Sequence, residues 1–516
     1  MNGAESLVLT LLKSKVNVCF ANPGTSEMHF VAALDRITGM RCVLGLFEGV
    51  VTGAADGYFR IARKPACTLL HLGPGLANGL ANLHNAKKAK SGIVNIVGEH
   101  ALNHLKLEAP LTSDINGIAQ PVSQAIYTPK EVRHVGQLAA SAVASATNTP
   151  PEVSTLILPA DMAWKDGGIV GTRLPPREPN LIDDAIIKET AETLQKREKS
   201  LILLGGNALT EKTISVASRV ASKTGAKLLS EWANARMDRG RGVFSISRIP
   251  YIVDQALSIL QEFKNIILVD AQQPVAFFAY PNKPGVLAPS EAKVTRLCDS
   301  IHDIEDALLR LEDKISFSKI NNPAKNIEPE MPSIPTGQIT SDGIACVLAN
   351  FIPENSIIVD ESITTGRNFF HYTANSARHT WLNNKGGSIG FGLPLAVGAS
   401  VAAPSNKVIV LESDGSAMYT NQALWTMARE NLNITILIFS NRSYKILFGE
   451  LKNVGLTSPG KISSKIFSLR DPDLNWVSLS LSMGVDAKKV SNMAELSKSF
   501  IYAMEQKCPY LIEVEL

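Results

Sequence analysis

This 516-residue chain lacks the features that mark several specialised classes of protein. No apolar run approaches the roughly 18 uninterrupted residues that a membrane-spanning helix needs. The apolar stretch near the N-terminus is interrupted by Lys13 and Lys15, and it lacks both a basic start and a small-residue cleavage site. The sequence therefore predicts a soluble protein that does not associate with a membrane.

Cysteine is scarce and widely spaced. The chain has six cysteines and no C-x-x-C pair. This pattern argues against a disulfide framework and against a structural zinc site. We therefore expect a cytoplasmic protein whose thiols are free. The six residues are Cys19, Cys42, Cys67, Cys298, Cys346 and Cys508.

An excess of charge of either sign is also missing. The 51 Lys and Arg residues nearly balance the 48 Asp and Glu residues, and the basic ones are scattered along the chain. This distribution excludes an electrostatic footprint for nucleic acid or anionic lipid. With 45% hydrophobic and 19% charged residues, the composition is that of a packed globular protein. The expected partner is a small molecule.

The pattern of apolar runs divides the chain into three domains. Short apolar runs alternate with segments of helical period, which is typical of a parallel sheet with helices on both faces. Pro-rich stretches at 175–179 and 321–337 interrupt this alternation. The sequence therefore predicts an α/β fold with three consecutive doubly wound parallel-sheet domains. Their boundaries are 1–170, 180–322 and 338–516, with a linker at 323–337.

Two polar residues stand at the ends of adjacent predicted strands in the third domain. Asp414 follows the apolar run KVIVL, and Asn441 follows ITILIFS. In a parallel sheet both would lie at the carboxyl edge, where such folds bind ligands. Their oxygens could hold Mg²⁺ against a diphosphate, aided by the backbone N–H of Gly415 and the hydroxyl of Ser416. Alternatively, Asp414 only forms a turn and Asn441 only caps a loop.

The interval between these residues resembles the signature of the thiamine-diphosphate-dependent 2-oxo-acid enzymes, which include acetolactate synthase and benzoylformate decarboxylase. That signature is G-D-G followed, after a similar interval, by N. Here Asn441 lies 27 residues after Asp414, and Ser413 replaces the first glycine. The resemblance covers the whole chain and identifies the domains, in order, as pyrimidine-binding, central and diphosphate-binding. It implies that Asp414, Asn441 and the carbonyl of Ser443 ligate Mg²⁺.

The same resemblance assigns catalytic roles in the first domain. In FEGVVTGAADGYFR it places Glu48 at N1′ of the cofactor's aminopyrimidine, which a shielded carboxyl would polarise. It makes His71, which follows 23 residues later, a proton shuttle. In FANPGTSEMHF it makes Thr25 the hydroxyl that binds the substrate carboxylate, and Gly24 a cofactor contact. Taken alone, Glu48 is equally a helix-dipole glutamate, and His71 a strand-end histidine that bonds backbone carbonyls.

The resemblance also implies a cofactor seat and a substrate pocket. In NNKGGSIGFGLP the carbonyl of Gly387 would meet the 4′-amino group, and Ile389 would wedge beneath the cofactor because its χ1 angle is stiff. The second active-site histidine of benzoylformate decarboxylase corresponds to Ala279 and is therefore absent. The remaining expected contacts are Thr364 and Tyr444 for the cofactor, and Leu111 and Leu447 for the substrate pocket.

The implied activity is decarboxylation of 2-oxo acids with thiamine diphosphate and Mg²⁺ through a C2 ylid and an enamine. Carboligation to an aldehyde or keto acceptor could follow. Two alternatives remain open: an acetolactate synthase-type transferase that condenses two 2-oxo acids, and a non-catalytic cofactor-binding homologue. FAD is possible in the central domain, but SLILLGG lacks the G-x-G-x-x-G spacing that would support it.

The expected assembly follows from the division of the cofactor site. The pyrimidine half and the diphosphate half lie in separate domains, and the family joins them across a subunit boundary. We therefore expect a homodimer or homotetramer with active sites at the subunit interface.

Overall fold

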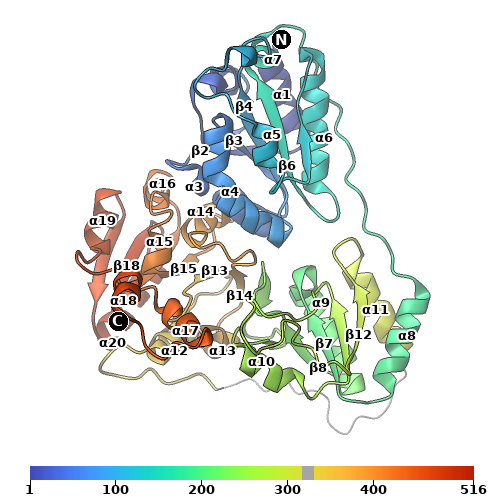
Figure 1. The fold of residues 1–516 in the computed structure, drawn as a ribbon, viewed down its shortest axis with the longest axis vertical. Helices are drawn as coiled ribbons and strands as arrows, with labels where there is room; N and C mark the ends of the chain where they lie inside the picture. The colour runs from blue at the N-terminus through green and yellow to red at the C-terminus, as the bar shows by residue number, and fades with distance from the viewer. Residues whose placement is uncertain (316–329) are drawn as a thin grey trace.

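Three α/β units follow one another along the chain (Figure 1). The structure, a computed structural model, describes residues 1–315 and 330–516. The predicted linker at 323–337 lies outside the described residues as far as residue 329, and the rest of it forms neither helix nor strand. Across the described ranges, no helix combines the length and apolar character that a membrane span requires.

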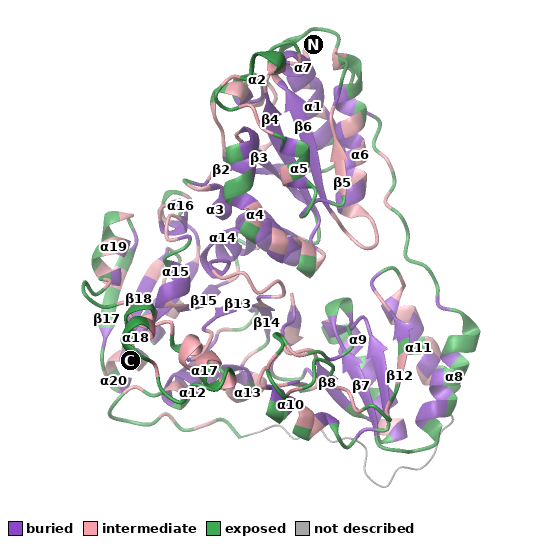
Figure 2. Cartoon of the chain, viewed as in Figure 1, coloured by how far each residue is buried: buried purple, intermediate pink, exposed green. Residues whose placement is uncertain are grey.

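The N-terminal unit is built around a sheet of six parallel strands. In spatial order they are β2 (Arg41–Leu44), β1 (Val18–Asn22), β3 (Ala66–Leu70), β4 (Ile93–Glu99), β6 (Val153–Pro159) and β5 (Ala125–Tyr127). Helices α1 (Gly3–Lys13) and α6 (Val135–Thr147) cover one face, and α3 (Glu48–Ala62) and α4 (Leu72–Ala89) cover the other. Because helices exclude water from both faces, β3 and β4 are buried along their whole length (Figure 2).

Short helices complete this unit. They are α2 (Met28–Arg36), α5 (Ile115–Ala119) and α7 (Ala160–Trp164), with a 3₁₀ turn, η1 (Thr25–Glu27), before α2. Helix α4 begins at Leu72. His71 therefore stands directly before the first residue of α4.

The central unit contains five parallel strands. Their order is β10 (Ser247–Arg248), β8 (Lys227–Ser230), β7 (Ser200–Leu204), β11 (Asn265–Val269) and β12 (Lys293–Cys298). Helices α8 (Asp184–Gln195), α9 (Glu211–Thr224) and α11 (Ile304–Lys314) pack on one face, and α10 (Val253–Leu260) packs on the other. This unit is thus a second doubly wound sheet.

The C-terminal unit carries the longest sheet. Its strands, in order, are β17 (Asp486–Val490), β18 (Tyr510–Glu515), β16 (Ile434–Ser440), β15 (Val408–Ser413), β13 (Ser356–Glu361), β14 (His379–Asn383) and β9 (Met237–Arg239). Its helices are α12 (Ser341–Phe351), α13 (Phe369–Tyr372), α14 (Gly392–Ala402), α15 (Asp414–Ala417), α16 (Ala423–Arg429), α17 (Lys445–Asn453), α18 (Lys461–Phe467), α19 (Trp476–Ser482) and α20 (Met493–Glu505). The predicted α/β class with three wound sheets is therefore observed.

Strand β9 corrects the prediction that every sheet is purely parallel. It lies within the central part of the sequence, yet it pairs antiparallel with β14 at the edge of the C-terminal sheet. Arg239 is buried there, and its guanidinium lies 3.4 Å from the centre of the Phe370 ring. The pairing covers an edge that would otherwise expose unpaired backbone groups, and it ties two domains together.

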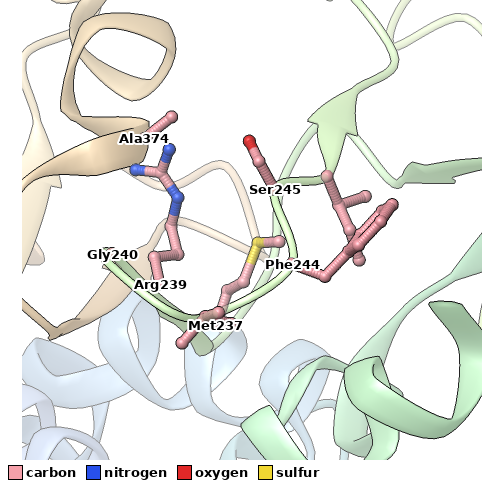
Figure 3. Close-up of a pocket in the computed structure, with 8 residues that line it drawn as sticks. Met237, Arg239, Gly240, Phe244, Ser245 and Ala374 are labelled. Atoms are coloured by element: carbon pink, nitrogen blue, oxygen red, sulfur yellow. The ribbon is translucent and has the colours of Figure 1, made fainter. Parts of the chain in front are cut away.

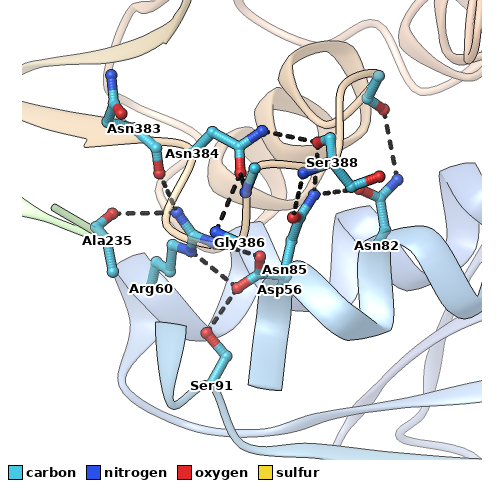
Figure 4. Close-up of polar contacts among 12 residues, drawn as sticks. Asp56, Arg60, Asn82, Asn85, Ser91, Ala235, Asn383, Asn384, Gly386 and Ser388 are labelled. Carbon is cyan, nitrogen blue, oxygen red and sulfur yellow. Dashed lines mark hydrogen bonds and ion pairs between the residues drawn. The ribbon is translucent and has the colours of Figure 1, made fainter. Parts of the chain in front are cut away.

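Helix α3 of the first domain packs closely against α14 of the third. Gly57 and Gly398 face backbone carbonyls across this contact, so a β-carbon at either position would collide with the opposite helix. Beside the contact, Arg60 and Asp56 form a buried ion pair of 2.6 Å, and Arg60 also donates to the carbonyls of Ala235 and Asn383 (Figure 4). One guanidinium therefore links all three domains.

Candidate active site

Strained backbone marks the strand ends where the sequence placed the site. Leu72, Ile363 and Arg442 have positive φ angles of 49°, 47° and 54°. They follow β3, β13 and β16, respectively. Residues other than glycine rarely adopt this conformation, which costs about 1–3 kcal/mol and is concentrated at functional sites. These three strand ends therefore carry strained backbone of the kind that is concentrated at functional sites.

Glu48 and His71 lie next to each other in the N-terminal domain. Glu48 is the first residue of α3 and is only 9% exposed. Its Oε2 accepts a 3.0 Å hydrogen bond from Nδ2 of Asn78. A β-carbon at Gly75 would lie 3.3 Å from Oε1 of Glu48 and 3.4 Å from Cβ of His71. The structure therefore brings these two predicted residues to one place beside the start of α4.

A carboxylate that the sequence reading overlooked holds His71. Nδ1 of His71 lies 2.8 Å from Oε2 of the buried Glu27. Glu27 also accepts hydrogen bonds from the backbone N–H of Gly24, at 2.8 Å, and from the hydroxyl of Ser26, at 2.7 Å. Since an ionised carboxylate only accepts, Nδ1 of His71 carries the proton and Nε2 is left to exchange one. The signal was available, because Glu27 belongs to the FANPGTSEMHF segment that suggested Thr25.

Thr25 and Ser26 are presented differently by this segment. Thr25 is exposed, whereas the hydroxyl of Ser26 lies 3.3 Å from Nδ1 of His71. The reason is the 3₁₀ turn η1, which rotates successive side chains by about a third of a turn and aims residue 26 at the histidine. Gly24 contacts the same imidazole, and a β-carbon there would overlap the ring. Ser26 is thus the hydroxyl that the fold places beside His71.

Replacing Glu27 by glutamine should lower kcat/KM by about 100-fold, because the neutral amide lacks the negative charge and one of the two acceptor oxygens that hold His71 in its orientation and tautomer. Steady-state kinetics with the 2-oxo acids expected from the sequence would measure this. Glu131→Gln is the matched control, since Glu131 forms only an exposed ion pair with Arg133. Equal kinetics for the two variants would show that Glu27 does not act through His71.

The second polar group joins the ends of β15 and β16. Oδ2 of Asp414 accepts a 2.6 Å hydrogen bond from the backbone N–H of Arg442, and its Oδ1 accepts from Gly415 at 2.9 Å. Oδ1 of Asn441 accepts from the N–H of Ser443, also at 2.9 Å. Burial raises the pKa of Asp414 to about 6, although the two N–H donors oppose this shift.

These groups suit a hard divalent cation. A carboxylate, an amide oxygen and the nearby backbone carbonyls are the donors that Mg²⁺ prefers, and the ion usually keeps further positions for phosphate or water. Nowhere in residues 1–315 and 330–516 do three or more His, Cys, Asp or Glu side chains gather as a metal site. A metal held here by Asp414 would therefore have fewer than three such side chains from the protein and would depend on amide, backbone and ligand oxygens to complete its shell.

The expected cofactor seat is a loop fixed from two domains (Figure 4). Oδ1 of Asn384 accepts the N–H groups of Gly386 and Gly387, at 3.1 and 2.7 Å. Asn85 of α4 exchanges two hydrogen bonds with the backbone of Ser388. Gly387 has a φ of 85°, and among the described residues no group donates a hydrogen bond to its carbonyl. That oxygen therefore has unused capacity to accept a ligand N–H.

A pair of buried glutamates lies beneath this loop. Glu361 and Glu412 are aligned partners on the parallel strands β13 and β15, and both side chains are almost completely buried. Glu361 accepts the backbone N–H groups of Gly390 and Gly392, at 2.7 and 2.6 Å. Burial raises the pKa of Glu361 to about 8, and burial together with the charge of Glu361 raises the pKa of Glu412 well above its ordinary value.

This pair predicts a pH effect on the stability of the ligand-free protein. A carboxyl whose pKa is higher in the folded state stabilises the protein while protonated, and this contribution is lost as pH rises from the unfolded value, near 4.5, to about 8. Glu412→Gln removes one such group. The unfolding temperature of Glu412→Gln minus that of the parent protein should therefore become larger from pH 5.5 to pH 8, as measured by differential scanning fluorimetry. Parallel pH curves for the two proteins would contradict the prediction, and Glu192→Gln on the surface is the control.

The other predicted site residues are distributed around these groups. Thr364 is half-buried in the turn after β13, and Ile389 is half-buried in the seat loop. Tyr444 precedes α17 and its ring packs against Gly415. Leu447 is half-buried on α17, whereas Leu111 is exposed on a loop of the first domain. Ser416 is buried in α15. The structure thus places Thr364, Ser416 and Tyr444 near strand ends of the C-terminal domain.

Two cavities lie away from these groups. One, of about 10 Å³, lies where β9 meets the C-terminal domain, and its lining includes Arg239, Phe244 and Ala374 (Figure 3). It can hold at most one water molecule. The other, of about 260 Å³, is a polar cleft between the three domains, and its lining includes Arg236, Asp238 and His379. Neither is lined by the predicted catalytic or metal-binding residues.

The Gly-rich turn of the central domain does not favour a flavin. Gly206, which follows β7, lies directly against the carboxylate of Asp270, and the N–H of Asn207 donates to that carboxylate at 2.8 Å. A dinucleotide phosphate at this turn would meet a negative charge instead of free N–H donors. FAD binding, which the sequence left unsupported, therefore gains no support from the structure either.

Comparison with known proteins identifies relatives over the full length. The model of the thiamine pyrophosphate enzyme N-terminal TPP-binding domain matches residues 1–124, and that of the C-terminal TPP-binding domain matches residues 364–514. A Mycobacterium tuberculosis protein, provisionally named acetolactate synthase large subunit, is 43% identical over 515 residues, covering 100% of this chain and 99% of its own. Benzoylformate decarboxylase of Pseudomonas aeruginosa is 26% identical, covering 98% and 97%.

Solved structures show the same fold. The thiamine diphosphate-dependent 4-hydroxybenzoylformate decarboxylase of Rhodococcus jostii superposes with a TM-score of 0.87 at 23% identity, covering 100% of this chain and 99% of its own. Benzoylformate decarboxylase of Polynucleobacter necessarius gives a TM-score of 0.83 at 22% identity, with 100% and 99% covered. At these identities the likeness concerns the three-domain architecture.

Proposed function

Because this chain belongs to the thiamine pyrophosphate (thiamine diphosphate) enzyme family, we propose that it is a Mg²⁺-dependent decarboxylase of 2-oxo acids with possible carboligation to an aldehyde or keto acceptor. The observation that carries the proposal is the adjacency of Glu48 and the Glu27-oriented His71. One group can hold a proton on a cofactor ring while the other moves a proton at the substrate. A non-catalytic homologue would have no need for such an arrangement.

The diphosphate end of the cofactor would be held by the C-terminal domain. Asp414, Asn441 and the carbonyl of Ser443 would bind Mg²⁺, and the N–H groups and hydroxyl of Gly415 and Ser416 lie at the same strand end. The carbonyl of Gly387 would accept the 4′-amino N–H. Bound thiamine diphosphate supplies a nucleophilic carbon and an electron sink for the electrons that the departing CO₂ leaves behind.

The protein's own groups would then manage protons and water. Glu48 sits in a shielded position and would hydrogen-bond N1′ of the pyrimidine, which sets the protonation of the opposite amino group. His71, with its Nδ1 tied to Glu27, would deliver or remove a proton through Nε2. Two hydroxyls would be available to bind the substrate carboxylate. Ser26 lies beside His71, and Thr25 is exposed next to it.

A panel of 2-oxo acids tests the reaction directly. Purified protein with thiamine diphosphate and Mg²⁺ should release CO₂ from at least one of pyruvate, longer aliphatic 2-oxo acids, benzoylformate and phenylpyruvate, with aldehyde as the product. Addition of an aldehyde acceptor should reveal any carboligation. Absence of CO₂ release from the whole panel, in protein that binds the cofactor, would overturn the proposal.

Acetolactate synthesis is the second candidate, favoured by the name of the relative that is 43% identical. The two activities share their steps up to loss of CO₂ and differ in the acceptor, so product analysis separates them. With pyruvate alone, acetolactate would support the synthase and acetaldehyde the decarboxylase. FAD plays no part in either proposal.

We also propose that the active sites lie at the interface of a homodimer or homotetramer. The hydrogen bonds of Glu48 and His71 all lie within the N-terminal domain, and those of Asp414 within the C-terminal domain. Mixed dimers of Glu48→Gln and Asp414→Ala subunits test this, because sites shared between subunits would leave one intact site. Activity in the mixture, with neither variant active alone, is the expected result. An inactive mixture of confirmed heterodimers would place each site within one chain.

A further inference from the structure

The central domain presents an aromatic wall to the seat loop. A β-carbon at Gly387 would lie 2.7 Å from Cζ of Phe277. The Phe277 ring in turn packs edge-to-face against Trp232, with centroids 5.3 Å apart, and lies 5.8 Å from Tyr251. Phe277 and Phe278 are 37% and 53% exposed, so apolar surface is available beside the seat. Phe277 therefore reaches the loop that is expected to hold the cofactor.

The far end of this wall is polar and negative. Glu450 of α17 accepts a 2.8 Å hydrogen bond from the hydroxyl of Tyr280 and longer ones, of 3.3 Å, from Tyr251 and Asn453. Burial raises the pKa of both tyrosines, so their hydroxyls stay protonated and donate. Glu450 lies one helical turn after Leu447, on the same side of α17. The wall thus runs from Gly387 through Phe277 and Tyr251 to a carboxylate.

The hydrogen bonds to the carboxylate of Glu450 come from neutral donors. Within the described part of the chain, no Lys or Arg side chain forms an ion pair with it. Three N–H and O–H donors leave part of the accepting capacity of a carboxylate unused. Such a group attracts a ligand that donates a hydrogen bond, and it repels a second carboxylate in a partly desolvated site.

We propose that Glu450, with Tyr251 and Tyr280, sets the substrate class. The preferred substrate is a 2-oxo acid with an aromatic stem that ends in a hydroxyl or another neutral hydrogen-bond donor, and dicarboxylic 2-oxo acids are rejected. The aromatic stem packs on Phe277, and the donor reaches the carboxylate. This inference rests on the proposed function, because it names the substrate of the same site.

Matched substrate pairs test the inference in the holoenzyme. Benzoylformate is compared with its 4-hydroxy derivative, phenylpyruvate with 4-hydroxyphenylpyruvate, and 2-oxoglutarate serves as the dicarboxylic probe. In at least one of the two aromatic pairs the hydroxylated member should have a kcat/KM at least about tenfold higher, because its hydroxyl donates to a half-buried carboxylate. Glu450→Leu should abolish that preference. Glu450→Gln, which keeps the shape of the side chain, should raise kcat/KM for 2-oxoglutarate at least about tenfold by removing the charge.

Binding of unreactive analogues separates this inference from the proposed reaction. Mandelate and 4-hydroxymandelate, or phenyllactate and 4-hydroxyphenyllactate, retain the side chain but cannot lose CO₂ as 2-oxo acids do. Calorimetry should show tighter binding of a hydroxylated member, and Glu450→Gln should reduce that difference. If CO₂ release fails but this binding preference holds, the reaction is wrong and the pocket assignment stands. If 2-oxo acids react but neither Glu450 variant changes any pair, the pocket assignment is wrong.

Discussion

Glu48→Gln should reduce the turnover of 2-oxo acids by about 10²- to 10⁴-fold, the usual contribution of a positioned acid–base group. The carboxamide has nearly the same shape and can still receive the hydrogen bond from Asn78, so the fold and the cofactor site should survive. What is lost is a proton that can move between the side chain and the pyrimidine ring. The measurement is CO₂ release under saturating thiamine diphosphate and Mg²⁺.

The control for this variant is another buried glutamate far from the strand ends of the first domain. Glu513→Gln changes a carboxyl on β18 that is equally shielded from water. It should retain the parent rate once its unfolding temperature has been checked. Normal turnover of the Glu48→Gln protein would show that Glu48 is not an acid–base group in the reaction, and it would contradict the proposed catalytic role of the N-terminal domain.

Asp414→Ala should abolish the stabilisation that thiamine diphosphate and Mg²⁺ give to the folded protein. Ligands at 100 times their dissociation constant stabilise by about 2.7 kcal/mol, which thermal unfolding detects easily. The stability of the cofactor-free variant is measured as the baseline, because loss of the carboxyl also leaves the N–H groups of Arg442 and Gly415 without their acceptor.

The same carboxyl gives an internal control through pH. Mg²⁺ binds the ionised form, and protons compete for it below a pKa of about 6. Mg²⁺ affinity of the parent protein should therefore fall about tenfold per pH unit below pH 6, and change little between pH 7 and 8. An affinity independent of pH in this range, or an unchanged ligand-induced shift in Asp414→Ala, would place the metal elsewhere.

The two large effects have different physical origins. Asp414 acts on binding, so its loss should be visible in ligand-dependent unfolding even without a substrate. Glu48 acts on reactivity, so its glutamine variant should keep the ligand-dependent shift while losing turnover. Measuring both quantities on both variants therefore distinguishes an anchor from an acid–base group, whichever 2-oxo acid proves to be the substrate.

Some elements of the site were accessible from sequence because they depend on local order along the chain. Asp414 and Asn441 end successive parallel strands, and parallel strands place their carboxyl ends at the same edge. Glu48, which only the resemblance singled out, is the first residue of α3. Three wound sheets follow from the alternation of apolar runs and helical segments.

Other elements depend on contacts that no local pattern encodes. Ser26 lies beside His71 because a 3₁₀ turn sets the rotation of each side chain. The pairing of Glu361 with Glu412 depends on strand register, since a shift by one residue would turn one side chain to the opposite face. Likewise, β9 joins a sheet that is distant in sequence, and a three-residue strand has too few residues to show a period.

The sequence by itself determined the fold class, the order of the domains and the carboxyl ends of strands where Asp414 and Asn441 lie. These properties follow from periodicity and from the spacing between neighbouring elements. Only the tertiary structure decided that Glu27 holds His71, and that Tyr251 connects Glu450 to Phe277, which lies beside the seat loop. Those contacts join side chains from separate turns, helices and domains, and their distances are set by packing of the whole molecule.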